Sequence, residues 1–186
     1  FIEPYLKPDG VLVSMQNSLN DEWIAPIIGR ERDIACVLTG GGELLGPGRA
    51  WRNRSMQHSY YTLGELDGKV TTRLEELVRI LSDAGKTRIS TDIMATKWTK
   101  LVLNSQSSVA SLCNERTWDL VDDPRYVPAL AEITKEAMHI GAALGYRFEP
   151  IAGMTAENLL GEPERVVRNL IATTQKGSSK GSVNMV

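Results

Sequence analysis

The sequence predicts an α/β part followed by an all-helical part, with the boundary near residue 91. Short apolar segments of strand length alternate with helix-like segments up to about residue 90. Beyond residue 91 only helix-like segments follow, and no strand-like segment appears among them. Alternating strands and helices are typical of a parallel sheet covered by helices, whereas consecutive helices pack against one another.

The first predicted strand covers residues 11–15, a short apolar run that follows the turn signal Asp9-Gly10. A helix is predicted next at residues 21–28, and Gly29 is a natural end for it. The apolar face predicted for this helix consists of Trp23, Ile24, Ile27 and Ile28.

Two further strands are predicted at residues 34–39 and 59–66, and a helix is predicted between residues 70 and 84. A last short strand is expected at residues 89–90. Three consecutive glycines at residues 40–42 lack both the G-x-G-x-x-G spacing and a following helix, so a flexible loop is expected there rather than a phosphate-binding turn. A turn is predicted at Gly46-Pro47-Gly48.

The all-helical part contains one long predicted helix at residues 92–113 and another at residues 124–144, which Gly145 ends. A third helical pattern at residues 156–174 is interrupted near Gly161-Glu162-Pro163. The tail at residues 178–182 is polar and glycine-rich, as terminal segments often are.

Composition excludes several classes of partner. The chain has 21 Lys and Arg residues against 23 Asp and Glu, a formal net charge of −2, which disfavours nucleic-acid binding. Its apolar runs are shorter than the roughly 18 residues needed to cross a bilayer, so no membrane span is expected. His58 and His139 lie far apart in different predicted elements, and the two cysteines cannot form a Cys-rich site, so no metal is expected. A cytoplasmic location is expected.

A polar stripe on the long helix is the most informative pattern in the chain. Lysine, asparagine and serine side chains recur there at spacings of three and four on an otherwise apolar helix: Lys97, Lys100, Asn104, Ser107, Ser108 and Ser111. The stripe fits a solvent-facing side of an ordinary amphipathic helix. The alternative is the lining of a polar cleft, in which Lys100 and Asn104 face one ligand and burial brings the lysine pKa toward the range of a proton donor.

Asn17 is a second candidate, because it follows the first predicted strand at the end where α/β sheets bind ligands. Asn17 could contact a ligand there, or it could simply turn the chain. If it acts with the stripe, Lys100 and Asn104 should leave their helix on one side, with the Asn17 loop on the opposite wall of one cleft. Trp98 should then point to the other side of the helix and pack among the helices.

Several motifs together resemble the 2-dehydropantoate 2-reductase (ketopantoate reductase) family. The most specific is Trp-Thr-Lys-Leu-Val-Leu-Asn at residues 98–104, preceded by Asp92-Ile93. The supporting motifs, in matching order and spacing, are Lys-Pro-Asp-Gly-Val at 7–11, Gln-Asn at 16–17, Leu-Gly-Pro-Gly at 45–48 and Gly-Glu-Leu-Asp-Gly at 64–68.

The resemblance implies two domains. Residues 1–90 would be the C-terminal portion of a Rossmann-type dinucleotide-binding domain, without the glycine-rich first turn of the family. Residues 91–186 would be a substrate and dimerisation domain of the 6-phosphogluconate-dehydrogenase-like helical type, incomplete at its C-terminus. The implied reaction is the NADPH-dependent reduction of a 2-keto acid, ketopantoate to pantoate, on the route to pantothenate and coenzyme A. A homodimer is among the expected assemblies.

Carried over residue by residue, Lys100 falls on the family's catalytic lysine and Asn104 on its substrate-binding asparagine. Asn17 falls on the asparagine that approaches both cofactor and substrate. Ser108 stands where the family has a second asparagine, and Asn184 where it has a substrate-contacting serine. These two replacements keep an alternative open, in which the protein is a catalytically idle paralogue that binds a small acid or serves as an oligomer scaffold.

Overall fold

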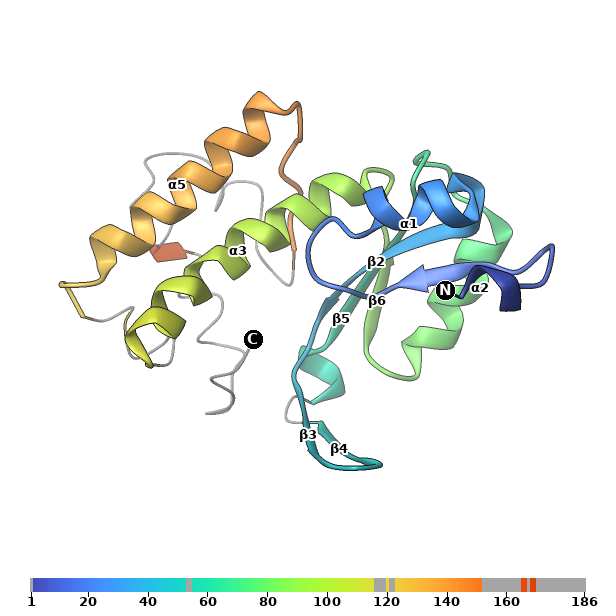
Figure 1. The fold of residues 1–186 in the computed structure, drawn as a ribbon, viewed down its shortest axis with the longest axis horizontal. Helices are drawn as coiled ribbons and strands as arrows, with labels where there is room; N and C mark the ends of the chain where they lie inside the picture. The colour runs from blue at the N-terminus through green and yellow to red at the C-terminus, as the bar shows by residue number, and fades with distance from the viewer. Residues whose placement is uncertain are drawn as a thin grey trace. The chain divides into compact units, whose positions relative to one another are not determined.

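The computed structural model describes residues 2–52, 55–115, 120, 123–151, 165–166 and 168–169 of the chain. The chain divides into two compact units. The first comprises Phe1–Gly40 and Ser55–Lys97, and the second comprises Gly41–Arg54 and Trp98–Val186. Figure 1 gives the element labels used below. Three single 3₁₀ turns accompany the longer elements, at Glu3–Tyr5, Arg30–Arg32 and Met56–His58.

The first unit is built on a four-stranded sheet with the order β1-β2-β5-β6. Its strands are β1 (Leu12–Ser14), β2 (Asp33–Thr39), β5 (Tyr60–Glu65) and β6 (Lys86–Ile89). Helix α1 (Asp21–Ile28) joins the parallel strands β1 and β2, and helix α2 (Thr72–Ser82) joins the parallel strands β5 and β6. These crossovers confirm the predicted alternation of strands and helices.

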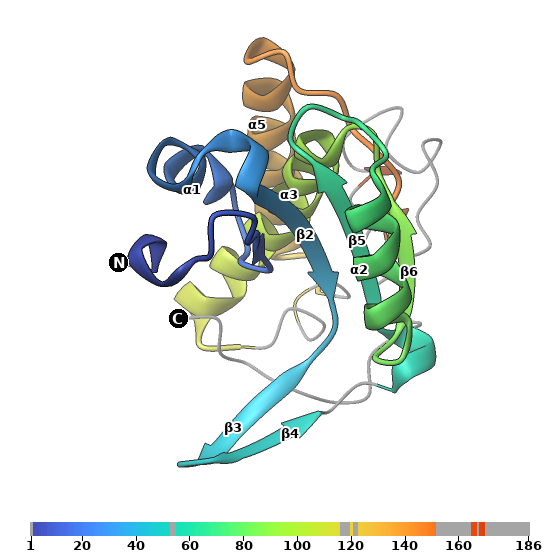
Figure 2. The same cartoon turned by 90° about the vertical axis from the view of Figure 1, so that its right-hand side faces the viewer.

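Helix α2 covers one face of the sheet (Figure 2). The core on this face forms because Ile34 and Cys36 of β2 and Leu63 of β5 pack against Leu74 of α2, all of them fully buried. Side chains alternate along a strand, so Asp33 and the other odd-numbered residues of β2 point to the opposite face.

The parallel pattern expected for the sheet is broken at one position, because β5 runs antiparallel to β2. The register pairs Thr39 with Tyr60 and Ile34 with Glu65. A parallel neighbour requires a crossover that carries the chain back along the sheet, usually a helix. Between β2 and β5 the described residues contain only a short hairpin and one 3₁₀ turn, so β5 starts beside the end of β2 and runs the other way.

The predicted apolar face of α1 is also wrong in part. The buried residues are Asp21, Ala25 and Ile28, which lie at i, i+4 and i+7 and therefore share one side of the helix. Trp23 and Ile27, expected to be inside, are 78% and 63% exposed. The buried side of α1 therefore differs from the predicted apolar face, and it includes a charged residue, Asp21.

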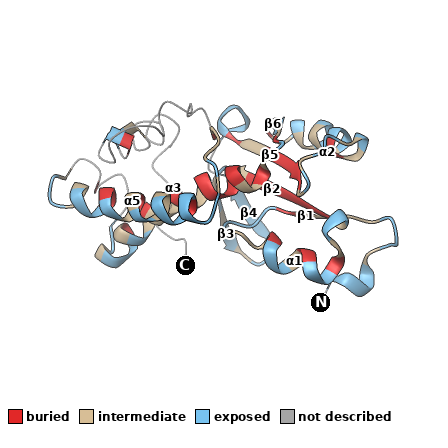
Figure 3. Ribbon diagram, turned by 90° about the horizontal axis from the view of Figure 1, so that it is seen from above, coloured by how far each residue is buried: buried red, intermediate tan, exposed pale blue. Residues whose placement is uncertain are grey.

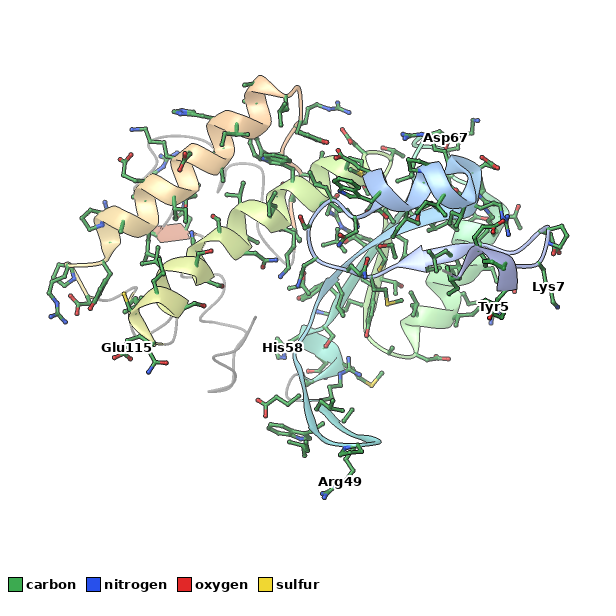
Figure 4. All side chains as sticks on the ribbon, in the orientation of Figure 1. Tyr5, Lys7, Arg49, His58, Asp67 and Glu115 are labelled. Carbon is green, nitrogen blue, oxygen red and sulfur yellow. The ribbon has the colours of Figure 1, made fainter. Side chains whose placement is uncertain are left out.

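The second unit contains a hairpin of β3 (Gly42–Gly46) and β4 (Arg49–Arg52). Gly42, expected in a flexible loop, opens β3, and its backbone lies close to that of Trp51 across the ladder. The turn predicted around Pro47 is confirmed by the positive φ of Gly48, and Arg49 lies at this end of the hairpin (Figure 4).

The two long helices are confirmed close to their predicted bounds, α3 at Ile93–Cys113 and α5 at Val127–Ala143. In the second unit they share a core of Ala110, Leu120, Leu130 and Ala131. Inside that region Gln106 of α3 donates from Nε2 to Thr134 Oγ1 of α5 at 3.1 Å.

Most of the third predicted helical pattern, at 156–174, lies outside the described residues. No helix in the described part of the chain has the length and apolarity to span a membrane.

Candidate active site

Asn17 lies in the loop between β1 and α1, at the carboxyl end of β1, and is exposed. The side chain of Asn20 donates from Nδ2 to the backbone oxygen of Asn17 at 2.6 Å. Ser18 adopts the left-handed backbone conformation, with φ of 70°, which non-glycine residues rarely take. The loop is therefore held in a defined and mildly strained conformation beside a parallel strand pair.

Helix α3 begins in the first unit against strand β5. A Cβ atom at Gly64 would lie 2.5 Å from Cβ of Ile93 and 2.7 Å from the backbone oxygen of Ser90, so only glycine allows this approach. Asp92 caps the helix, since its Oδ1 accepts from the backbone N–H of Ala95 at 3.2 Å. The first turn of α3 is thus fixed on the sheet.

Lys97, the first residue of the polar stripe, is not at the surface. Its ammonium forms an ion pair with the carboxylate of Asp21, the first residue of α1. The Lys97 and Asp21 side chains are 2% and 1% exposed. At this position the interpretation of the stripe as a solvent-facing surface is wrong. The physical reason is that Asp21 compensates the charge of Lys97 inside the protein.

Asp33, at the start of β2, adds a second buried carboxyl to this region. Its pKa is raised from 3.8 to about 6, mainly by burial and also by the nearby charge of Asp21, whereas the charges of Lys97 and Arg30 act in the opposite direction. Neither carboxyl oxygen of Asp33 has a hydrogen-bond partner among the described residues. We call Asp21, Asp33 and Lys97 the buried charge cluster.

Lys100 and Asn104 lie further along α3, both half-buried and one turn apart. Four residues advance about 40° around a helix, so the two side chains leave α3 on the same side. Ser108, a further turn along, is exposed. Asn184 lies outside the described residues. Asn17 belongs to the first unit, and Lys100 and Asn104 to the second. That they face one ligand stays a prediction.

Trp98 packs among the helices, as predicted from its position two residues before Lys100. Its indole N–H donates to the backbone oxygen of Ala137 in α5 at 3.0 Å. Its ring stacks on Tyr146. Figure 3 shows that burial is concentrated in the first turns of α3 and becomes patchy toward its end. The polar stripe therefore runs from a buried charge at Lys97 to exposed serines such as Ser108.

A lysine and an asparagine one turn apart suit a small ligand with carbonyl or carboxylate oxygens. The ammonium is a cationic donor, and the carboxamide offers both a donor and an acceptor. Within the described residues, no three His, Cys, Asp or Glu side chains are grouped as a metal site would require.

Comparisons with known proteins bear on this arrangement. The profile of the family described as "Ketopantoate reductase PanE/ApbA C terminal" matches residues 92–183, a segment that contains the whole of α3 and of α5. A curated 2-dehydropantoate 2-reductase of Archaeoglobus fulgidus is 28% identical over 157 residues, covering 80% of this chain and 52% of the relative. The chain belongs to the ketopantoate reductase family.

Solved structures agree on the fold. The 2-dehydropantoate 2-reductase of Geobacter metallireducens GS-15 superimposes with a TM-score of 0.78 at 22% identity, covering 98% of this chain and 57% of that one. A D-mandelate dehydrogenase determined with NADH gives a TM-score of 0.72 at 16% identity, covering 94% and 53%. The chain thus spans about half the length of these relatives, and its fold combines the C-terminal part of a Rossmann domain with the family's helical domain.

The buried charge cluster is the part of this region that sequence reasoning missed. The sequence places Lys97 in the polar stripe and Asp21 at the start of the helix predicted at residues 21–28, with nothing to connect the two. One signal was available: Lys97 directly precedes Trp98 on a predicted helix that is otherwise largely apolar, and a lysine buried there needs a partner of opposite charge. No pattern in the sequence identifies Asp21 as that partner.

Proposed function

We propose that this chain acts in the NADPH-dependent reduction of a 2-keto acid, with the conversion of ketopantoate to pantoate as its preferred reaction. The observation that carries the proposal is the pair Lys100 and Asn104, one turn apart on α3 and inside the segment that the ketopantoate reductase family profile matches. The A. fulgidus relative is named for this reaction.

In this proposal Lys100 is the general acid. When bound, NADPH supplies a hydride to the keto carbon, and the carbonyl oxygen gains negative charge. The Lys100 ammonium donates a proton to that oxygen, which yields the hydroxyl group, and recovers its proton from solvent. Half-burial of Lys100 suits this role, because an ammonium partly shielded from water interacts more strongly with a developing negative charge than one in bulk water.

Asn104 and Asn17 would orient the reactants. Asn104 would bind the oxygens of the keto acid, with Ser108 and Asn184 extending the substrate-binding surface. Asn17 would contact both substrate and the nicotinamide end of NADPH. The exposed position of the Asn17 loop supports a contact with the cofactor. The loop lies at the carboxyl end of a strand in a parallel pair, where nucleotides bind to α/β sheets.

The wider expectations form part of the same proposal. Residues 1–90 would serve the dinucleotide, and residues 91–186 the substrate and the contact between subunits of a cytoplasmic homodimer. One structural relative is described as a dimeric ketopantoate reductase from Staphylococcus aureus.

The decisive experiment replaces Lys100 by alanine in the full-length protein and follows NADPH absorbance with ketopantoate and a panel of other 2-keto acids. We expect kcat to fall by a factor of about 10² to 10⁴, the usual contribution of a general acid, while the Kd for NADPH changes little. Lys135→Ala, which removes the same charge from helix α5, is the matched control and should keep normal turnover. A Lys100→Ala enzyme with near-normal kcat would refute the role.

The idle-paralogue alternative rests on Ser108 and Asn184, which replace family residues. The same assay separates the two functions. A folded wild-type protein that oxidises NADPH with none of the 2-keto acids would favour the alternative, whereas turnover with any of them would exclude it.

A further inference from the structure

The Asn17 loop, residues 15–20 between β1 and α1, is anchored at both of its ends within the first unit. At its start β1 pairs in parallel with β2, and Ser14, the last residue of β1, is buried. At its end Asp21 is 1% exposed and forms an ion pair with Lys97, which belongs to the same unit. Displacing Asp21 would leave a buried charge without compensation, which is strongly unfavourable. The loop therefore has a fixed beginning and a fixed end.

Between these two ends, the side chain of Asn20 reaches back to Asn17. Its Nδ2 donates to the backbone oxygen of Asn17 at 2.6 Å, across the left-handed Ser18. Asn20 stands at the N-cap position of α1, yet within the described residues its side chain caps no backbone N–H of that helix. The hydrogen bond thus joins the exposed Asn17 to the residue directly before the anchored Asp21.

The hydrogen bond from Asn20 lies at the surface, where water can replace either partner, so it adds little to the stability of the fold. A comparable bond occurs in α2, where Ser82 Oγ donates to the backbone oxygen of Arg79. That bond is also 2.6 Å long, also joins residues three apart, and is also exposed. Of the two, the bond from Asn20 is the one that holds a residue of the proposed site. Comparing them separates positioning of Asn17 from general stability.

We infer that Asn20 is a positioning residue for Asn17: by holding the backbone of Asn17, it sets the direction in which the Asn17 side chain meets the reactants. The inference rests on the proposed function, which assigns to Asn17 the contacts with substrate and with the nicotinamide end of NADPH. Asn20 itself need not touch either reactant. A carboxamide must place both its donor and its acceptor correctly. Misplacement of reacting groups by about 1 Å can reduce turnover about 10²-fold, so the loss of one hydrogen bond in this loop is sufficient to change turnover.

The test is a double-mutant cycle in the full-length protein, with Asn20→Ala, Asn17→Ala and the variant that carries both changes. We expect each single change to lower kcat for the 2-keto acid by about 10-fold. In the Asn17→Ala background, Asn20→Ala should lower kcat by less than about twofold more, because the side chain that Asn20 positions is already absent. A purely structural role for Asn20 would instead lower kcat by the same factor in both backgrounds.

Two further variants and two further measurements sharpen the result. Asn20→Asp keeps the shape of the side chain but cannot donate, so it should lose as much kcat as Asn20→Ala. Ser82→Ala is the matched control and should keep normal kcat. The urea unfolding midpoints of Asn20→Ala and Ser82→Ala should fall by similar small amounts. The Kd for NADPH should rise about three- to tenfold in Asn20→Ala and Asn17→Ala, the range for one lost hydrogen bond, and should not change in Ser82→Ala.

The outcomes separate this inference from the proposed function. If Asn17→Ala lowers kcat while Asn20→Ala and Asn20→Asp keep it normal, the positioning role is wrong and the proposed function stands. Equal losses from Asn20→Ala with and without the Asn17 side chain would also overturn the positioning role, because Asn20 would then act independently of Asn17. Normal kcat and normal Kd for NADPH in Asn17→Ala would overturn the part of the proposed function that concerns Asn17, and the inference with it.

Discussion

The indole ring of Trp98 stacks on the ring of Tyr146, with the ring centroids 4.6 Å apart and the planes 13° from parallel. Trp98 belongs to α3, and Tyr146 follows the end of α5. The indole also lies against Gly141 of α5, whose missing side chain makes room for the Trp98 ring. The three residues fix how the two helices of the second unit pack where α3 enters it.

Gly141→Ala should therefore destabilise the protein, although alanine is the better helix former. A Cβ at this position would overlap the indole Nε1 of Trp98 and disturb its hydrogen bond to Ala137. We expect the free energy of unfolding, measured with urea, to fall by about 1 to 3 kcal/mol, the usual cost of overpacking. At an unobstructed helical position the same change would raise the free energy of unfolding by about 1 kcal/mol. A stabilised Gly141→Ala variant would therefore contradict the prediction.

Asp33→Asn should stabilise the protein at neutral pH. The pKa of the buried Asp33 carboxyl is raised from 3.8 to about 6, so ionising this carboxyl is less favourable in the folded state than in the unfolded state. The free energy of unfolding of the wild-type protein therefore decreases as the pH rises from about 4 to above 6. The shift corresponds to about 3 kcal/mol at full ionisation, an upper limit for the gain on removing the charge. Thermal unfolding should show Asp33→Asn more stable than wild type at pH 8 and nearly equal to it at pH 4. A gain independent of pH would contradict the explanation.

Glu65→Gln should have the opposite dependence on pH. Glu65 is buried and accepts hydrogen bonds from Arg73 Nε at 2.8 Å, Arg73 Nη2 at 2.7 Å and Thr71 Oγ1 at 2.6 Å. The hydrogen bonds from Arg73 hold the pKa of Glu65 below its usual value, so the stabilisation is complete above about pH 4.5 and is lost as pH falls through the lowered pKa. We expect Glu65→Gln to cost about 2 kcal/mol at pH 7, measured by chemical unfolding, and progressively less in acid.

Asp67→Asn is the control for Glu65→Gln. Asp67 pairs with Lys69 at 2.7 Å, but both side chains are exposed, and Asp67 lies at the surface turn after β5 (Figure 4). An exposed ion pair contributes little to stability, so the free energy of unfolding of this variant should be close to that of the wild type at every pH. Similar losses for Glu65→Gln and Asp67→Asn would show that burial of Glu65 is not the source of its effect.

Ser18→Gly should relieve the strain in the loop beside Asn17. A non-glycine residue in the left-handed conformation costs roughly 1 kcal/mol, whereas glycine adopts it freely but loses more entropy on folding. We expect a net gain of about 0.5 kcal/mol in thermal unfolding for Ser18→Gly and no gain for Ser18→Ala. If both variants behave alike, the serine side chain rather than the backbone conformation governs this position.

The sequence determined the local elements and the residues of the candidate site. Hydrophobic periodicity predicted α2, α3 and α5 closely, because apolar spacing and capping residues act within one segment of chain. The helical spacing of four also places Lys100 and Asn104 on one side of α3, whatever surrounds the helix. The packing of Trp98 among the helices followed from the same geometry.

Only the tertiary structure decided which segments meet. The direction of β5, the inward face of α1 and the pairing of Lys97 with Asp21 each depend on residues far apart in the chain, and no local pattern encodes such contacts. Asp21 looked like an ordinary first-turn acid, and Lys97 like one member of a polar stripe. Their burial becomes favourable only when the fold brings the opposite charge within reach, since neither charge could be buried alone.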